Sequence, residues 1–344
     1  MGIGDLLRSS AAWAALKAKW PQAQLHLLML SKHAGYASQD FIRSHHLLAS
    51  ASFITVKSGQ PGQPQRSLPY AQVTQSALQA VAGTRIDMVI DCEPYGIRTS
   101  RLARHIAKQH KAVSVGIAQF PLRSWFYSLA APSVPRYMAA HQLAAPMDYT
   151  ERDFVALAAL GIQRDGRRIE LQLNAQGRAW QQQHAHYFAG TVQHVALNIG
   201  CGTADALPKR PDISALVSAM VCWYQQSPFV LHLTGADFEN DINEEFVAQF
   251  TQALKALGYE AVCTNWAGKC TLNELAGLIA LTQIMVSTDS GPYHMAVALG
   301  VPTVCWFKFA TPASYHLHDD VAVLVEPTAH EFAQAALRLS LRRA

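Results

Sequence analysis

Short apolar runs alternate with helix-length amphipathic segments along the chain, and this alternation constrains the fold more than any other feature. Strand-like runs occupy residues 24–30, 53–56, 86–92 and 112–117 in the first half. Further runs occupy residues 195–198, 229–234, 259–264, 284–287 and 303–307, with helical segments between them. Strands and helices that alternate in this way form parallel sheets covered by helices. We therefore predict an α/β protein.

The length of the chain indicates two domains. It has 344 residues, more than one hydrophobic core usually supports. A polar segment with two glycines, residues 161–168, separates the two series of strands. We place the boundary there, with an N-terminal domain at residues 1–163 and a C-terminal domain at residues 164–344.

Several protein classes are excluded by composition. Half of the residues are apolar and only 15% are charged, which argues against intrinsic disorder. No apolar run reaches the roughly 18 to 20 residues that span a bilayer, and Asp5 lies where a secretion signal would be basic. The six cysteines are scattered without a C-x-x-C pair, which argues against a zinc site or a disulfide framework. We expect a cytoplasmic protein with no metal site.

The charge is distributed unevenly between the two halves. Residues 1–150 hold 15 Lys and Arg against 6 Asp and Glu, a net charge of +9, whereas the remaining residues hold 13 against 18, a net charge of −5. The basic half lacks a recognisable nucleic-acid module, so nucleic acid is not expected as a partner. An anionic lipid surface or a phosphorylated acceptor fits better, although a solvated basic face without function is the simpler alternative.

Residues 287–303 carry the most informative motif. An apolar strand stops at Asp289-Ser290-Gly291, and a helix begins at once, with Ser290 in the position of an N-cap. The amides of a helix N-terminus attract anions, and Gly291 lets a phosphate approach the backbone closely. His294, one turn into the helix, can donate to the same phosphate. The alternative is that these residues only cap the helix and that His294 is an ordinary surface histidine.

A second glycine-rich turn follows another strand of the same half, at residues 198–211. It combines Gly200 and Gly202 with the hydroxyl of Thr203 and the cations Lys209 and Arg210. This composition suits a diphosphate, although it is not a Walker A loop. One such turn is weak support for a phosphate site, but two in one domain strengthen each other.

These motifs resemble glycosyltransferase family 9, the lipopolysaccharide heptosyltransferases of bacteria. The resemblance rests on the run at residues 289–302, the loop at 198–211, the segment at 268–276 and the opening residues 2–5. It implies the GT-B fold, in which two Rossmann-like domains face each other. It also implies an inverting, metal-independent enzyme without a cofactor, which moves heptose or a related sugar from an ADP-sugar to a lipid-linked saccharide of the lipopolysaccharide core.

The resemblance also implies roles for individual residues. Asp5 would be the general base, Lys209 would neutralise the leaving ADP, and Asp289 would contact the sugar hydroxyls. Glu239 would hold the ribose, and Cys270 would line the adenine. The donor-binding residues implied in this way are Gly202, Thr203, Lys209, Glu239, Cys270, Asp289, Ser290, Gly291, Pro292 and His294.

One departure from the family concerns the N-terminal domain. The family begins with a buried strand before the Gly-x-Gly-Asp loop, whereas Met1 directly precedes that loop here, so we predict that the first strand is missing and that the true start lies upstream. Two alternatives stay open: a nucleotide-sugar epimerase of the same fold, and a donor-binding homologue with impaired catalysis. The basic half would allow peripheral contact with the cytoplasmic face of the inner membrane.

Overall fold

The chain forms two compact units. The computed structural model describes residues 2–32, 35–58, 66–200, 204–309 and 315–341. Unit 1 comprises residues 8–169, and unit 2 comprises residues 170–344 together with residues 2–7. The sequence analysis placed the division between residues 163 and 164 and assigned the whole N-terminus to the first domain. Residues 2–7 group with unit 2 instead, because the helix that they form packs against a helix of that unit.

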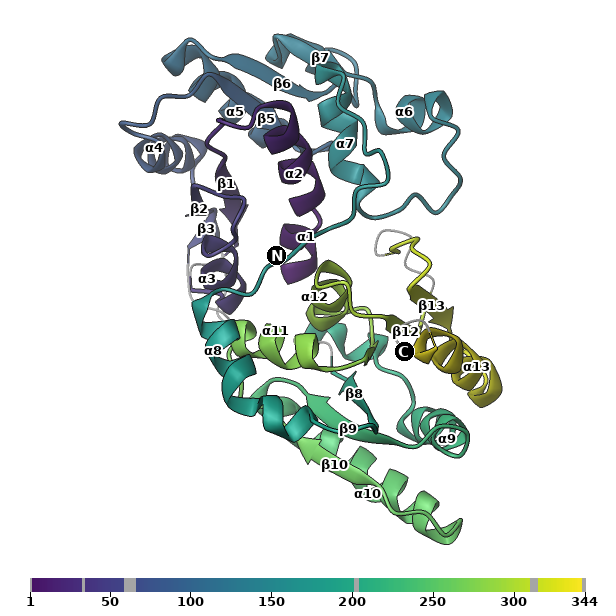
Figure 1. Ribbon diagram of the computed structural model, residues 1–344. Helices are drawn as coiled ribbons and strands as arrows, with labels where there is room; N and C mark the ends of the chain where they lie inside the picture. Colours follow the sequence, from purple (N-terminus) through teal and green to yellow (C-terminus); the bar gives the residue numbers. More distant parts are fainter. Residues whose placement is uncertain (1, 33–34, 59–65, 201–203, 310–314, 342–344) are drawn as a thin grey trace. The chain divides into compact units, whose positions relative to one another are not determined.

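Unit 2 is built on a six-stranded parallel sheet with the order β10-β9-β8-β11-β12-β13 (Figure 1). Its strands β8, β9, β11 and β12 match the predicted runs closely, whereas β10 begins three residues later than predicted and β13 was not predicted. The strands are β8 (Gln193–Asn198), β9 (Phe229–Thr234), β10 (Val262–Asn265), β11 (Ile284–Ser287), β12 (Thr303–Phe307) and β13 (Val321–Val325).

The helices of unit 2 fall into two groups. One group consists of α9 (Ile213–Tyr224), α10 (Asn240–Ala256) and α13 (Ala329–Ser340), and the other of α8 (Ala175–His184), α11 (Leu272–Leu281), α12 (Gly291–Ala298) and α1 (Ile3–Leu7). The first group encloses a core of aromatic rings, which includes Trp223, Phe229, Phe250 and Phe332. Short 3-10 helices are η3 (Ala185–Phe188), η4 (Ala204–Lys209) and η5 (Asp237–Glu239).

The strands of unit 1 fall into separate small sheets. Parallel pairing joins β1 (His26–Ser31) to β2 (Ser50–Thr55), and separately β5 (Met88–Asp91) to β6 (Val113–Ile117) and β7 (Leu129–Ala131). A small antiparallel pair joins β3 (Lys57–Ser58) to β4 (Arg66–Ser67). In a Rossmann-like sheet the first strand lies inside the sheet and pairs with a neighbour on each side. Within the described residues, no strand joins β1 to β5 in this way. Among the described residues, β1 and β5 therefore belong to separate sheets, and the expectation of a start upstream of Met1 stays a prediction.

Two apolar cores hold the small sheets of unit 1 together. In one core, Leu28 of β1 and Val89 of β5 both pack against residues of α4 (Tyr70–Ala80) and α5 (Ile97–His110). In the other, Ile90 of β5 packs with α2 (Ser10–Lys19) and α7 (Glu151–Leu157). The remaining helices of unit 1 are α3 (Ala37–Arg43), α6 (Val134–Ala140), η1 (Arg123–Phe126) and η2 (Ala158–Leu160).

The N-terminal segment differs from its prediction. A single helix was expected at residues 6–20 after a Gly-x-Gly-Asp loop, but residues 3–7 already form α1, and a separate helix, α2, begins at Ser10. In unit 1, the start of α2 is fixed to α7, because Ser9 donates a 2.6 Å hydrogen bond to the buried Asp153 and Arg8 forms a 3.0 Å ion pair with the same carboxylate. No helix in the described part of the chain is long and apolar enough to cross a membrane.

Candidate active site

The candidate site of unit 2 lies where the order of its sheet reverses. Strands β8 and β11 are neighbours, and their last residues, Asn198 and Ser287, are paired in register. The chain leaves β8 toward β9 and leaves β11 toward β12, which lie on opposite sides of this pair. In open parallel sheets such a reversal leaves a crevice at the carboxyl ends of the strands, where ligands bind. The two turns singled out in the sequence both begin at this crevice.

Buried hydrogen bonds connect the two turns to each other. Ser290 donates a 3.0 Å bond to Oδ1 of Asn198, and Thr288 donates a 2.8 Å bond to the carbonyl of Gly200. Ser290 occupies the N-cap position of α12, as predicted, but its side chain forms no capping bond. The predicted cap is therefore wrong for the side chain, because its hydroxyl is used to join the two strand ends. Pro292 lies in the first turn of α12, where a missing amide proton costs nothing.

Lys209 and Asp289 form an ion pair at the crevice. The distance between Nζ of Lys209 and Oδ2 of Asp289 is 2.7 Å. The Asp289 side chain is buried, whereas that of Lys209 is 40% exposed, so the ammonium group can be reached from solvent. The sequence analysis gave these residues separate roles, on the diphosphate and on the sugar. The structure brings them together, as a ligand with both groups requires.

Glu239 lies beneath the turn that contains Gly200. Its carboxylate accepts a 2.9 Å bond from the amide of Ala236 and lies 3.4 Å from the guanidinium of Arg210. A Cβ atom on Gly200 would collide with this carboxylate, so a larger residue there requires the Glu239 side chain to move. Among the described residues, the buried Nε of Arg210 has no hydrogen-bond partner. The charge of Arg210 is paired with Glu239, but its Nε remains a donor without an acceptor, which an anionic ligand beside this turn could supply.

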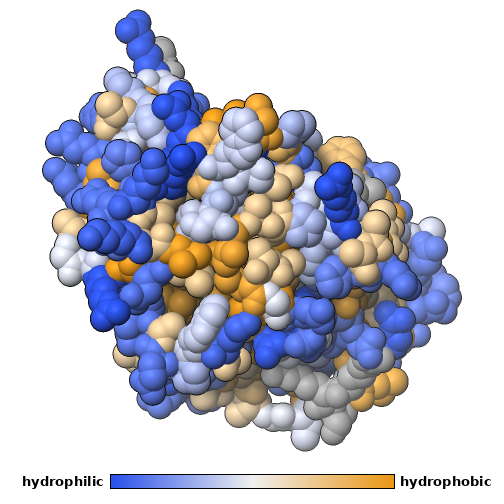
Figure 2. Space-filling view, turned by 90° about the horizontal axis from the view of Figure 1, so that it is seen from above, coloured by the Kyte–Doolittle hydropathy of each residue, from blue (hydrophilic) through white to orange (hydrophobic). Residues whose placement is uncertain are grey.

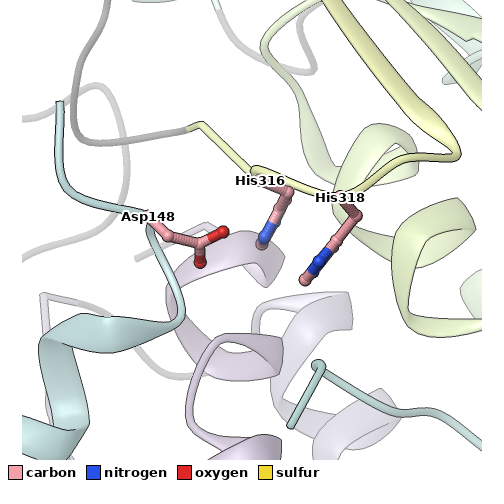
Figure 3. Close-up of side chains that lie close together, drawn as sticks. All are labelled: Asp148, His316 and His318. Atoms are coloured by element: carbon pink, nitrogen blue, oxygen red, sulfur yellow. The ribbon is translucent and has the colours of Figure 1, made fainter. Parts of the chain in front are cut away.

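His294 is buried in unit 2, unlike the surface histidine considered as an alternative. Its Nδ1 lies 2.9 Å from Nε2 of His316, and the hydroxyl of Tyr293 accepts a 3.1 Å bond from the amide of His316. Figure 3 shows His316 and His318 on one segment of the chain. The planes of their rings are 11° apart. One nitrogen of His294 is thus used inside the protein, so any bond to a phosphate depends on Nε2.

Helix α1 covers the amino end of α12. Cβ atoms added to Gly4 and Gly291 would collide with His294 and Ile3 respectively, so the two helices meet at their glycines. Asp5, the predicted general base, is half-buried on this helix rather than on a loop. The expected loop is wrong, and the role of Asp5 stays a prediction.

The remaining predicted residues are placed less directly. Gly202 and Thr203 lie outside the described residues. Cys270 lies just before α11, and burial raises the pKa of its thiol to about 11, so it stays protonated at neutral pH. Such a thiol can line an apolar surface but does not act as a nucleophile. In unit 1, Asp148, also drawn in Figure 3, forms a 3.1 Å ion pair with Arg164.

Sequence reasoning missed Asn198, Thr288 and His316 as parts of the site. Asn198 ends one predicted strand and Thr288 directly follows another, and a prediction of strand order would have placed these two strand ends side by side. His316 lies in a segment without any predicted element, so no sequence signal pointed to it.

Comparisons with known proteins agree on the family. Residues 76–330 match the model of glycosyltransferase family 9 (heptosyltransferase). The chain is 35% identical over 71 residues to the lipopolysaccharide core heptosyltransferase OpsX of Haemophilus influenzae, a match that spans 20% of each protein. This match therefore shows similarity over that segment alone.

Two solved structures share the fold over nearly the full length. A family 9 glycosyltransferase of Veillonella parvula has a TM-score of 0.71 at 16% identity and covers 99% of this chain and 95% of its own. The Escherichia coli heptosyltransferase WaaC, solved with ADP, has a TM-score of 0.64 at 15% identity, with 100% and 98% covered. At these identities the likeness establishes the GT-B fold alone.

Proposed function

Since the chain belongs to glycosyltransferase family 9 (heptosyltransferase), we propose that it transfers heptose or a related sugar from an ADP-sugar to a lipopolysaccharide core-type acceptor. The observation that carries the proposal is the meeting of Lys209, Asp289 and Ser290 at the reversal of the sheet in unit 2. A cation within reach of solvent, beside a buried carboxylate, suits a ligand that carries both phosphates and sugar hydroxyls.

The residues of unit 2 would divide the work on the donor as follows. Lys209 is placed to stabilise the negative charge that develops on the leaving ADP. Arg210, whose Nε is buried without a partner among the described residues, can add a second donor. Asp289 accepts from the sugar, and Glu239 accepts from the ribose. Electrostatic stabilisation of a leaving group by fixed cations is often the largest contribution to such a reaction.

The transfer step would be a single inverting displacement. The acceptor oxygen forms a bond to the anomeric carbon while the bond from that carbon to the diphosphate oxygen breaks. The electron pair of the broken bond leaves with ADP, and the acceptor proton passes to the carboxylate of Asp5. This role requires that the carboxylate lies within hydrogen-bond reach of the acceptor hydroxyl. No metal or cofactor takes part in the proposed step.

The proposed partners follow from this reaction. They are the nucleotide-sugar donor and a lipid-linked saccharide acceptor, and nucleic acid is not among them. We place the protein in the cytoplasm, with peripheral contact between its basic unit 1 and an anionic membrane surface.

The experiment that tests the proposal measures ADP release from ADP-heptose with and without a lipopolysaccharide core acceptor. Release that depends on the acceptor supports transfer. Donor binding without release, measured by calorimetry with ADP, UDP and GDP, would identify a binding protein instead. Interconversion of the nucleotide sugar without an acceptor would identify an epimerase.

A further inference from the structure

A groove runs between α4 and α5 on unit 1. It has a volume of about 640 Å³, and its lining includes Ala71, Leu78 and Ala82 on the α4 side and His105 on α5. Among all its lining residues there is no Asp or Glu. The lining also contains the uncharged polar residues Thr74, Gln75, Gln79 and Gln109. A shallow channel that combines aliphatic residues with uncharged polar ones and has no acidic group can take an alkyl chain.

A second, basic pocket continues this groove. It has a volume of about 280 Å³ and is lined by Arg101, Arg104, Lys108, Tyr70, His105 and Phe126. Tyr70 and His105 line both depressions, so the apolar groove opens directly into the basic pocket. The combined shape presents an apolar channel at one end and three cations at the other.

The two arginines of the pocket lie over aromatic rings rather than beside acids. The guanidinium of Arg101 lies 4.8 Å from the ring centre of Tyr70, and that of Arg104 lies 5.9 Å from the ring centre of Phe126. Neither α4 nor α5 contains an Asp or a Glu. In the part of the chain that the structure describes, no carboxylate forms an ion pair with the three cations of the pocket. Their charge is therefore available to an external anion.

An exposed apolar segment borders the basic pocket. The carbonyl of Trp125 accepts a 2.7 Å bond from Arg104, while its side chain is 70% exposed. Leu122, three residues earlier, is 60% exposed and has a φ of 67°, an unusual conformation for a leucine. Exposed large apolar side chains beside cations are typical of surfaces that meet a membrane interface. Figure 2 shows one face of the molecule on which hydrophobic residues gather beside hydrophilic ones.

We propose that the α4–α5 face of unit 1 binds one anionic phospholipid of a membrane. The lipid phosphate lies on Arg101, Arg104 and Lys108, one acyl chain follows the groove past Leu78, and Trp125 and Leu122 enter the interface. The inference builds on the membrane contact proposed above and names the site and the ligand class. It is independent of the donor site in unit 2.

The test is calorimetry of the purified full chain with short-chain phosphatidylglycerol below its critical micelle concentration. We expect binding that is about tenfold tighter for the dioctanoyl than for the dihexanoyl lipid, because further methylene groups enter the groove. Phosphatidylcholine of the same chain length should bind at least about tenfold more weakly, because its headgroup has no net charge.

Two variants and a matched control locate the site. Arg101→Gln with Lys108→Gln leaves the bond from Arg104 to Trp125 in place and should weaken phosphatidylglycerol binding about tenfold or more. Ala71→Trp should fill the groove and remove the dependence on chain length while the charge is unchanged. Arg98→Gln with Arg136→Gln removes the same charge from exposed positions outside both depressions and should have little effect.

Three results would overturn the inference. If the Arg98/Arg136 control variant loses as much affinity for phosphatidylglycerol as the Arg101/Lys108 variant, the lipid is held by diffuse electrostatic attraction only. Inorganic phosphate that binds as tightly as the lipid would mean a free-anion site. Absence of phosphatidylglycerol binding to the wild-type chain would remove the site altogether. ADP affinity, measured on the same samples, reports on the proposed function separately and should not change in any of these variants.

Discussion

The two units contain strands of similar apolar character that differ in burial. In unit 2, every residue of β11 and β12 is buried. In unit 1, most residues of β1 and β5 are only half-buried, although their sequences are as apolar. The difference follows from pairing, because β11 has a neighbour on each side, whereas β1 and β5 are edge strands of small sheets. An apolar run predicts a strand, but its burial depends on the strands beside it.

The units also differ in how they use a carboxylate at the end of a strand. In unit 1, Asp91 ends β5, and the hydroxyl of Tyr127 donates a 2.7 Å bond to it, while the nearby Arg123 side chain is only 2% exposed. In unit 2, Asp289 follows β11 and pairs with Lys209, which solvent can reach. The first cluster is closed to solvent, whereas the second includes a cation that solvent can reach.

Hydrogen exchange should show the largest difference between the units. In unit 1, β1 and β5 lie in separate small sheets, so they lack the backbone hydrogen bonds that one continuous sheet would provide. Each unpaired backbone group costs about 1 to 3 kcal/mol where it is buried. We expect the amides of β1 and β5 to exchange on the order of 10⁴-fold faster than those of β8 and β11, measured by mass spectrometry. Equal protection would mean that the split sheet is as stable as the continuous one.

The Asp5→Asn substitution tests whether the N-terminal helix belongs functionally to unit 2. We expect turnover to fall on the order of 10² to 10⁴-fold, the usual range for a general base, with ADP affinity nearly unchanged. Steady-state kinetics with ADP-heptose and calorimetry with ADP provide the two values. An equal loss of binding and turnover would assign Asp5 a structural role in α1.

Acid should weaken unit 2 through a buried histidine pair. Burial, and then the neighbouring His194, lower the pKa of His232 to about 4, below its value of about 6.5 in an unfolded chain. The neutral form of His232 therefore contributes about 3 kcal/mol to the free energy of unfolding above pH 6.5. This contribution is lost as the pH falls toward 4. In unit 1 burial raises the pKa of Asp91, so its contribution has the opposite sign, present at low pH and lost as the pH rises through the folded pKa.

The pH dependence can be measured by chemical unfolding between pH 7 and pH 4, followed in each unit by hydrogen exchange. His232→Gln keeps an acceptor for the 3.2 Å bond from Trp266 but cannot titrate, so the acid sensitivity of unit 2 should become smaller. The same pH dependence in wild type and variant would exclude His232 as its source.

Lys209→Ala should weaken ADP binding, and it should also lower the stability of unit 2, because the buried carboxylate of Asp289 loses its partner. Loss of a charge-assisted bond to phosphate costs roughly 1.5 to 3 kcal/mol, about 10 to 150-fold in the dissociation constant measured by calorimetry. Lys308→Ala is the matched control, since Lys308 also forms a 2.7 Å ion pair and has similar exposure but belongs to neither turn. Unchanged ADP affinity in the Lys209 variant would remove the assigned donor site.

Gly200→Ala should destabilise unit 2 by about 1 to 3 kcal/mol, because the new methyl group collides with the Glu239 carboxylate. Thermal unfolding measures this effect. Gly2→Ala, which meets no atom within 4 Å, is the control and should leave the unfolding temperature unchanged. A variant as stable as the wild type would mean that Glu239 can move away from the turn.

The sequence by itself determined the α/β class, most of the strands of unit 2 and the two turns of the candidate site. These features depend on local information: apolar periodicity fixes strands and helices, and a strand followed at once by Ser290-Gly291-Pro292 fixes the start of a helix.

Only the tertiary structure decided which side chains meet. The bond between Ser290 and Asn198, the pair of Lys209 with Asp289 and the contact of His294 with Gly4 join residues far apart in the chain. Such contacts depend on strand order and on helix packing, which periodicity does not encode. The same reason explains why the opening residues form a helix instead of the predicted loop: their packing against α12 was not encoded in their local pattern.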